Sequence, residues 1–326
     1  MIDLNPFPLR ILPRLKDHPA LRSLRRQPRI WRDTSDFTSI DYGDIILVDN
    51  RWFLVVGYMR EGRFGIDEQP KQWVPKVSDL ETGESNILKL VFHETYSIKF
   101  GDLKVTCYRN PEKEAQVLEL VRGNPAFMQG YSVLDDADNL VRILDVVQGN
   151  RMDKYLQRLG ETHEEYFRDH MVGVLQRFLL SVQAIAYLHS HGLKHGDIRR
   201  DHIFVDWDNG HFSWIDFDYD FYLPERPYAM DLFGLGNCLL YIVGRRNFRG
   251  QDVLEDPELG EKVFSSLRVE DMSLLARDRV FNLQKIYPYI PDRLNAILMH
   301  FSAGTSVIYD TVSEFHDELA DCVASL

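Results

Sequence analysis

The spacing of apolar residues changes along this chain, and the change restricts the folds open to it. Between residues 37 and 110, short runs rich in Val, Ile and aromatic residues are separated by turn signals such as Asp49-Asn50, which predicts paired strands. After about residue 160, the apolar residues from Tyr166 to Leu188 keep a helical period, which predicts a long buried helix. Strands followed by helices predict an α+β fold with two lobes.

The same patterns place the individual elements. Strands are expected at residues 44–48, 52–56, 74–80, 86–92, 202–206 and 211–216. A helix is expected to begin at Pro111, because proline suits a first helical turn and the following glutamates favour its positive end, and to stop at Gly123. We therefore expect a basic extension at 1–36, a strand-rich lobe at 37–145 and a helical lobe at 146–326.

The composition is that of an ordinary globular protein. The 326 residues are 44% hydrophobic and 27% charged, with a formal net charge of −12, which excludes extended disorder and disfavours nucleic-acid binding. Three widely spaced cysteines argue against a disulfide framework or a zinc site. No uncharged apolar run reaches the roughly 18 residues of a transmembrane segment, and no signal peptide is recognised. We expect a cytoplasmic protein.

The first 33 residues differ in charge from the rest of the chain. They contain eight basic residues and three acidic ones, whereas the chain as a whole is acidic. Such an arm is expected to dock on the acidic body of its own chain or, alternatively, on an acidic partner, a membrane surface or RNA.

Two acidic motifs bracket the second predicted hairpin. His195-Gly196-Asp197 precedes the hairpin and Asp216-Phe217-Asp218 follows it. Carboxylates in these two places suit phosphoryl transfer, in which one accepts a hydroxyl proton and the other holds Mg²⁺ on the phosphates. Acid-rich turns are common on protein surfaces, so this pair alone is weak evidence.

These motifs, with others in the same order, resemble the protein kinase family. Arg60-Glu61-Gly62-Arg63-Phe64-Gly65 is similar to the glycine-rich loop, although Arg60 replaces its first glycine, and Ile87-Leu88-Lys89 stands where the family has Ala-Ile-Lys. Glu114 matches the glutamate that pairs with that lysine. Asp145-Val146-Val147 resembles the hinge between lobes, and the run that begins at Asp231 resembles the buried helix of the second lobe. Several matches in the family's order make the resemblance specific.

The resemblance implies a role for each matched residue. Lys89 would hold the α- and β-phosphates of ATP and would be positioned by Glu114, while Asp216 would bind Mg²⁺ or Mn²⁺. Asp197 would orient the substrate hydroxyl and accept its proton, and Arg199 would supply positive charge near the transferring group. The nucleotide site would be completed by the glycine-rich loop and the hinge, at Gly62, Gly65, Leu144, Asp145 and Val147.

Four features depart from the family pattern. His202 stands where the family has an asparagine that binds a second Mg²⁺, so either it is a metal ligand that favours Mn²⁺, or it holds Asp197 by a hydrogen bond, or one metal suffices, or Asp201 or Asp218 substitutes. Gly196 replaces the arginine that receives an activation-loop phosphate. Asp231 follows Asp216 by only 15 positions, too few for the usual activation and peptide-docking segments. Insertions are predicted at 66–73 and 93–110.

Three hypotheses follow from the resemblance and its departures. The first is an atypical Ser/Thr protein kinase that uses ATP and acts on an unidentified substrate. The second is a pseudokinase that serves as a nucleotide-binding scaffold. The third is a small-molecule kinase of the aminoglycoside or choline kinase type, suggested by the His-Gly-Asp form of the catalytic motif.

Overall fold

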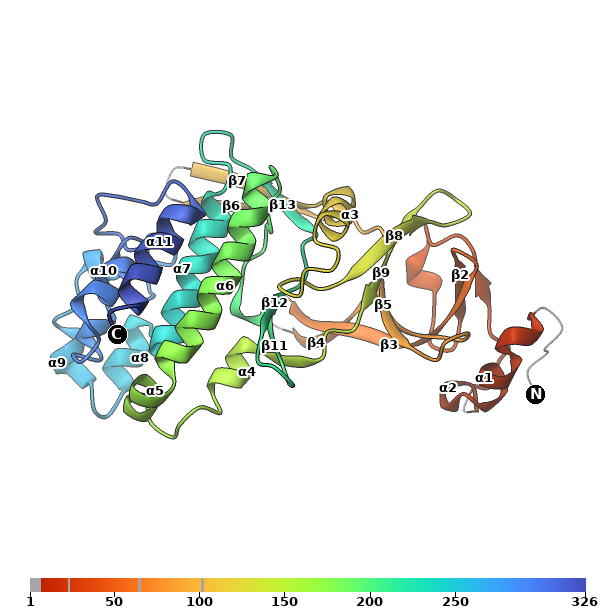
Figure 1. Ribbon diagram of the computed structural model, residues 1–326, viewed down its shortest axis with the longest axis horizontal. Helices are drawn as coiled ribbons and strands as arrows, with labels where there is room; N and C mark the ends of the chain where they lie inside the picture. Colours follow the sequence, from red (N-terminus) through yellow and green to blue (C-terminus); the bar gives the residue numbers. More distant parts are fainter. Residues whose placement is uncertain (1–6, 23, 64–65, 101–102) are drawn as a thin grey trace. The chain divides into compact units, whose positions relative to one another are not determined.

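The computed structural model describes residues 7–22, 24–63, 66–100 and 103–326, and the chain divides into two units (Figure 1). The first unit comprises Met1–Glu94, Pro111–Asn124 and Met128–Val147, and the second comprises Thr95–Asn110, Pro125–Phe127 and Gln148–Leu326. The predicted α+β class, with a strand-rich part followed by a helical part, is confirmed. The division differs from the expected boundaries, because the arm belongs to the first unit and residues 95–110 belong to the second.

A seven-stranded sheet forms the first unit, in the order β1-β2-β3-β4-β5-β9-β8. Its strands are β1 (Ile30–Trp31), β2 (Ile45–Val48), β3 (Arg51–Arg63), β4 (Ile66–Asp79), β5 (Ser85–Lys89), β8 (Gly130–Leu134) and β9 (Leu140–Asp145). Alternate residues of β3 enter two different clusters, because successive side chains of a strand point to opposite faces. Trp52 and Leu54 lie in one cluster, and Phe53 and Val55 in the other. Both faces of this part of the sheet are therefore covered.

The hairpin of β3 and β4 is longer than predicted. The residues expected as a loop insertion, 66–73, instead lie in β4, which begins at Ile66 and pairs with the end of β3. The register shifts between Tyr58, which faces Pro75, and Met59, which faces Lys71. Such a shift is a bulge in the ladder. The insertion thus extends the two strands and leaves an irregularity within them.

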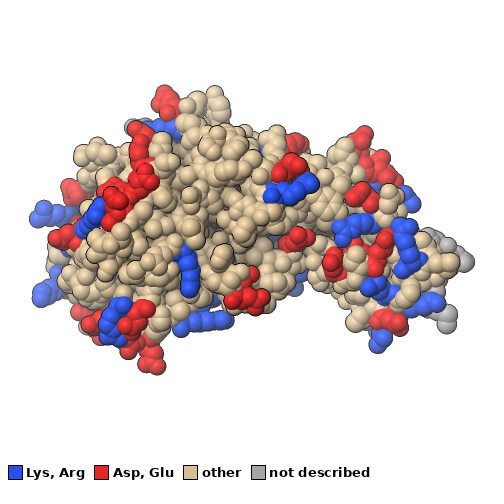
Figure 2. Space-filling view, in the orientation of Figure 1, with Lys and Arg blue, Asp and Glu red and all other residues tan. Residues whose placement is uncertain are grey.

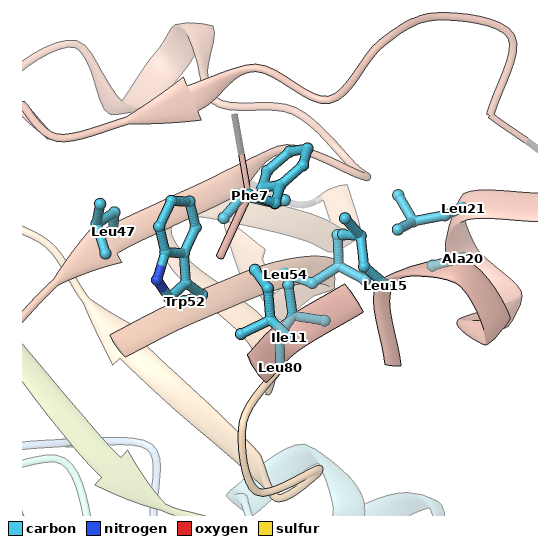
Figure 3. Close-up of a cluster of buried hydrophobic side chains, with 10 residues drawn as sticks. Phe7, Ile11, Leu15, Ala20, Leu21, Leu47, Trp52, Leu54 and Leu80 are labelled. Carbon is cyan, nitrogen blue, oxygen red and sulfur yellow. The ribbon is translucent and has the colours of Figure 1, made fainter. Parts of the chain in front are cut away.

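The N-terminal arm packs on one face of this sheet (Figure 3). It contains the short helices α1 (Leu12–Asp17) and α2 (Pro19–Arg22). Ile11, Leu15 and Leu21 of the arm join a buried cluster with Trp52 and Leu54 of the sheet. Burial of large apolar side chains stabilises such a contact by roughly 1.5–3 kcal/mol for each side chain. The arm is therefore part of the apolar core of the first unit.

The arginines of the arm contact acidic groups of the same chain. Arg10 Nε lies 2.7 Å from Glu81 Oε1, and Arg29 Nη2 lies 2.6 Å from Asp44 Oδ2. Asp44 is fully buried and also accepts from Arg26 at 2.5 Å. Burial acts to raise the pKa of Asp44, but hydrogen bonds from Arg29 and Arg26 outweigh it and lower the pKa. On the face shown in Figure 2, basic and acidic side chains are interspersed.

Helix α3 (Pro111–Leu120) begins at the predicted residue and packs against β8 and β9. Glu112 and Glu114 lie in its first turn, where negative charge is favourable. The segment that follows turns at Gly123, whose φ of +77° suits glycine. The local signals in the sequence therefore placed this helix correctly.

Helices make up most of the second unit. They are α4 (Met152–Leu156), α5 (His163–Asp169), α6 (Met171–Ser190), α7 (Ala229–Gly244), α8 (Gly250–Glu255), α9 (Gly260–Phe264), α10 (Asp292–Met299) and α11 (Val312–Val323). The prediction of one long helix from Tyr166 to Leu188 is wrong at its start. Thr162 begins α5 with a capping box, and His170 leaves the helical conformation before α6 begins. Apolar spacing continues across this break, which is why periodicity missed it.

Among the described residues, one helix, α6, is long and apolar enough to cross a membrane by length and composition alone. Half of its apolar window is buried within the fold, and it packs against α5, α7 and α11. Core helices of soluble proteins share these properties, so the helix is weak evidence for a membrane segment.

Two three-stranded sheets complete the second unit. One contains β10 (Gly149–Arg151), β11 (Ile203–Asp206) and β12 (Phe212–Trp214), of which the last two form the predicted hairpin. The other contains β6 (Thr95–Phe100), β7 (Leu103–Arg109) and β13 (Tyr219–Tyr222) in the order β13-β7-β6. In Figure 1 the orange β6–β7 hairpin runs beside the teal β13. This sheet joins the predicted insertion to the segment after Asp216.

Candidate active site

In the first unit, β5 and α3 bring together a buried lysine and a buried glutamate. Lys89 Nζ donates to Glu114 Oε1 at 2.8 Å, and the two side chains are 6% and 0% exposed. Lys89 is the last residue of β5, and Glu114 lies in the first turn of α3. Buried charges persist in folded proteins when they are paired and hydrogen-bonded. The geometry matches the lysine–glutamate pair that the sequence resemblance implied.

A third charged group at this place, Arg142, was not predicted from the sequence. It is the cross-strand neighbour of Lys89 on β9 and is almost fully buried. Arg142 Nε lies 3.2 Å from Glu114 Oε2, and Arg142 Nη2 donates to Leu90 O at 3.3 Å. Glu114 therefore accepts from two cations, one on each carboxylate oxygen. The one feature of the sequence that could have indicated this residue is an arginine within an otherwise apolar strand.

The expected hinge begins at Asp145, the last residue of β9. Leu144 is buried and pairs with Ile87 of β5, while Asp145 donates its backbone N–H to Gln129 O at 3.0 Å. Val147 is the last residue of the first unit. Of the predicted glycine-rich loop, Gly62 lies near the end of β3, and Gly65 lies outside the described residues.

In the second unit, a buried carboxylate fixes the loop that carries Asp197. Asp231, in the first turn of α7, accepts from His195 N and Gly196 N at 2.8 Å each. Its Oδ2 also lies 2.9 Å from His189 Nε2. The loop backbone is thus tied to the N-terminal end of a buried helix. This arrangement places Asp197 immediately after two anchored peptide groups.

Asp197, Arg199, His202 and Asp216 gather around the end of this loop. His202 Nδ1 donates to Asp197 O at 2.8 Å, and its Nε2 lies 2.9 Å from Arg199 Nη2 and 3.7 Å from Asp216 Oδ2. Arg199 Nε lies 3.7 Å from Asp197 Oδ1. Four residues that the sequence assigned to catalysis or metal binding are therefore neighbours in the second unit.

The surroundings of Asp197 shift its pKa. Burial raises the pKa of Asp197, although the nearby His202 and Arg199 act in the opposite direction. Asp216 has a positive φ of +68°, a conformation that costs a non-glycine residue about 1–3 kcal/mol and is common at functional sites. A carboxylate with a raised pKa and a second one in a strained backbone are both typical of active sites.

The metal-binding potential lies mainly with Asp216. Among the described parts of the chain, no group of three or more His, Cys, Asp or Glu side chains is arranged to hold a metal ion. Mg²⁺ commonly uses one or two protein carboxylates and takes its other ligands from water and phosphates, so a carboxylate at Asp216 fits. His202 fits less well, because its Nε2 accepts from Arg199 while its Nδ1 holds Asp197. The geometry favours the hydrogen-bonding role for His202.

Gly196 is required by a close backbone approach. Its φ is +87°, and a Cβ at this position would lie 1.8 Å from Tyr219 O in β13. Because backbone cannot yield as a side chain can, any other residue here must displace β13. The glycine of the His-Gly-Asp motif therefore accommodates the strand that follows Asp216.

Gly196→Ala is expected to lower the free energy of unfolding by about 4 kcal/mol or more. Gly192→Ala is the matched control, because Gly192 has a φ of +73° and a Cβ added there would meet no atom within 4 Å. This control should lose only the about 1–2 kcal/mol of an unfavourable backbone conformation. Urea unfolding of both variants measures the difference. Equal losses would show that the approach of Tyr219 is unimportant.

Comparisons with known proteins agree with these motifs. A model of the protein kinase domain matches residues 74–286. The match includes Lys89, Glu114, Asp197 and Asp216, and it begins after the predicted glycine-rich loop.

Two curated kinases illustrate the level of similarity. The chain is 25% identical over 244 residues to the mouse (Mus musculus) sperm motility kinase Tcr mutant form, covering 65% of this chain and 48% of that protein. It is 28% identical over 152 residues to the serine/threonine-protein kinase ksg1 of Schizosaccharomyces pombe, covering 41% of this chain and 24% of that protein. The chain thus spans about half or less of the length of these relatives.

Among solved structures, the kinase domain of PknI from Mycobacterium tuberculosis is similar with a TM-score of 0.46 and 14% sequence identity. The alignment covers 87% of this chain and 99% of that one.

Proposed function

Because the chain belongs to the protein kinase family, we propose that it is an ATP-dependent protein kinase that phosphorylates Ser or Thr hydroxyls. The observation that carries the proposal is the buried pair of Lys89 and Glu114, at 2.8 Å, retained together with Asp197 and Asp216. Four charged groups of the right chemistry at the family's positions would be unusual in a chain without phosphoryl-transfer or nucleotide-binding function.

Each side chain supports a specific part of this activity. Lys89, a compact cation, would hold the phosphates of ATP, and Glu114 keeps its ammonium group in place. Asp216 would hold Mg²⁺ or Mn²⁺, which supplies positive charge to the phosphates when bound. Asp197 would orient the acceptor hydroxyl and take its proton, and the raised pKa of this carboxyl suits a base. Arg199 would add positive charge nearby.

A second candidate function is nucleotide binding without transfer, as in a pseudokinase. One observation favours it: His202 replaces the family's asparagine, and its Nε2 accepts from Arg199 at 2.9 Å. A site that relies on Asp216 for its metal could still bind ATP yet transfer the phosphate slowly. Binding and transfer therefore have to be measured separately.

ATP with Mg²⁺ or Mn²⁺ is expected to raise the melting temperature of the parent protein, and Asp216→Asn is expected to abolish the metal-dependent part. A ligand at 100 times its Kd stabilises the folded state by about 2.7 kcal/mol, which thermal unfolding detects readily. Asp208→Asn, in an exposed turn of the same unit, is the matched control for the change in charge and should behave as the parent.

Transfer of labelled γ-phosphate to the protein itself, or to mixed Ser/Thr peptides, then separates the two candidates. Metal-dependent stabilisation with transfer supports the kinase, whereas stabilisation without transfer supports the pseudokinase. No stabilisation by ATP with either metal would contradict both. Metal-dependent stabilisation that survives in Asp216→Asn would contradict the role given to Asp216.

A further inference from the structure

The hairpin β6–β7 holds the segment that follows Asp216. β13 pairs antiparallel with β7, with Tyr219 opposite Arg109 and Phe221 opposite Cys107. At the start of this pairing, Asn110 N donates to Asp218 O at 2.6 Å. The hairpin lies more than 100 residues earlier in the sequence, between Lys89 and Glu114, yet it belongs to the second unit with Asp216.

A buried ion pair joins the hairpin to the motif of Asp216 itself. Arg109 Nη1 lies 2.5 Å from Asp218 Oδ2, and the two side chains are 3% and 2% exposed. The Arg109 guanidinium also lies 4.2 Å from the centre of the Tyr219 ring, within the range of a cation–π contact. Burial acts to lower the pKa of Arg109, but the charges of Asp218 and Asp216 outweigh it and raise the pKa. Arg109 is therefore a firmly charged cation beside the motif.

Further contacts tie the same segment to the loop of Asp197. Lys194 Nζ lies 3.0 Å from Asp220 Oδ1 and donates to Phe221 O at 2.7 Å. Asp220 Oδ2 accepts from Tyr108 of the hairpin at 3.3 Å. Lys194 directly precedes His195-Gly196-Asp197, so the strand after Asp216 is bound on one side to the hairpin and on the other to the catalytic loop.

The segment lacks the groups through which phosphorylation of Ser or Thr would order it. Between Asp216 and Asp231 the sequence contains tyrosines but no serine or threonine. Gly196 also stands where an arginine would receive an activation-loop phosphate. Here Arg109 takes the place of that arginine as the cation, and the carboxylate of Asp218 takes the place of the phosphate as the anion.

Asp218 needs such a partner for a physical reason. It lies two residues from Asp216 in the sequence, and a second unneutralised carboxylate there would repel the first. It would also compete for the metal that Asp216 is proposed to hold. Pairing with Arg109 neutralises Asp218 and fixes the backbone on which Asp216 sits.

We propose that Arg109 is a positioning residue for Asp216: by pairing with Asp218, it holds the metal-binding aspartate in its working conformation without phosphorylation of the segment. This inference rests on the proposed function, since it assumes that Asp216 binds a metal with ATP. On this inference, the part of the predicted insertion 93–110 that lies in the second unit, Thr95–Asn110, supports the conformation of the segment that carries Asp216.

The experiment titrates Mg²⁺ or Mn²⁺ at saturating ATP and records the metal concentration for half-maximal thermal stabilisation. Arg109→Met is expected to raise that concentration about 10- to 100-fold, as loss of a group supporting a metal ligand commonly does. Arg109→Lys should restore part of the affinity. Lys104→Met removes an exposed cation from the same strand and should match the parent. The double variant Arg109→Met with Asp218→Asn should bind metal better than Arg109→Met alone.

The outcomes separate this inference from the function on which it rests. A parent without metal-dependent stabilisation overturns both. If metal and ATP stabilise the parent, and Arg109→Met folds and needs the same metal concentration as the parent, only the role of Arg109 is overturned. Faster phosphoryl transfer in Arg109→Met would also overturn it, because the hairpin would then restrain the site. If Arg109→Met does not fold, Arg109→Lys and Asp218→Asn are compared with the parent instead. The proposal is refuted if both variants need the same metal concentration as the parent for half-maximal stabilisation.

Discussion

Asp197→Asn is expected to lower the rate of phosphoryl transfer by about 10²- to 10⁴-fold, the usual contribution of a positioned general base. Asparagine keeps the shape of the side chain but cannot accept the proton of the acceptor hydroxyl. Nucleotide binding should survive, because Lys89 and Asp216 are unchanged. Initial rates of γ-phosphate transfer, with thermal stabilisation by ATP as the control for binding, measure the effect.

The same variant should be at least as stable as the parent. Burial raises the pKa of Asp197 above its usual value, so ionisation of this carboxyl in the folded state costs free energy. A raised carboxyl pKa means that the folded protein binds a proton more readily than the unfolded chain does, and stability falls as pH rises through the shifted value. Removing the charge removes that cost at neutral pH. A variant both inactive and clearly destabilised would contradict this account.

The rate of phosphoryl transfer should depend on pH in the opposite direction to stability. Asp197 must be ionised to accept a proton, so the rate should fall as pH decreases through its raised pKa. The acid limb of the parent's profile should therefore lie above the roughly 3.9 of an ordinary aspartate. A profile that stays flat down to the usual aspartate range would show that Asp197 is not the base.

Asp231→Ala is expected to lower the free energy of unfolding by about 3–5 kcal/mol, because removing one partner of a buried charged network leaves the others without compensation. The change leaves the backbone N–H groups of His195 and Gly196 without their acceptor, and each buried orphan costs about 1–3 kcal/mol. Urea unfolding followed by far-UV circular dichroism measures the loss. Asp231→Asn, which keeps one acceptor oxygen, should lose less. An Asp231→Ala variant as stable as the parent would contradict the anchoring role.

Acid should weaken the same anchor. Burial acts to raise the pKa of Asp231, but hydrogen bonds from His189 and Gly196 N, with the charges of nearby histidines, lower it. A depressed carboxyl pKa contributes stability above the unfolded value near about 3.9, and that stability is lost as pH falls through the folded value. The parent should therefore lose more stability than Asp231→Asn when the pH is lowered into this range.

Predictions from the sequence were accurate where the signal was local. Helix α3 begins at the predicted Pro111, and the hairpin of β11 and β12 lies at the predicted turn. A capping pattern or a turn motif depends on residues within a few positions, so a single chain displays it. The prediction from apolar periodicity is wrong at His170, where α5 ends and α6 begins. The helical spacing of apolar residues continues through this position, so it gives no sign of the break.

Long-range neighbours were not predictable in the same way. Arg142 is a charged residue within an apolar run, and nothing adjacent to it in the sequence shows that Glu114 will accept its hydrogen bond. In the sequence, Gly196 indicates the loss of a phosphate-binding arginine, and the structure adds a steric reason for the glycine, the approach of Tyr219 O. Both features depend on which strand packs against which loop.

The α+β class, the order of strands and helices and the family can be predicted from the sequence alone, because apolar periodicity and the order of motifs are visible in a single chain. The folded structure is needed to show that residues 95–110 belong to the second unit and pair with the strand after Asp216. It is also needed to show that Arg109 pairs with Asp218, which lies 109 positions later in the sequence. Burial turns these two side chains from ordinary surface charges into a neutralising pair. That burial arises from contacts between distant segments, which local sequence does not encode.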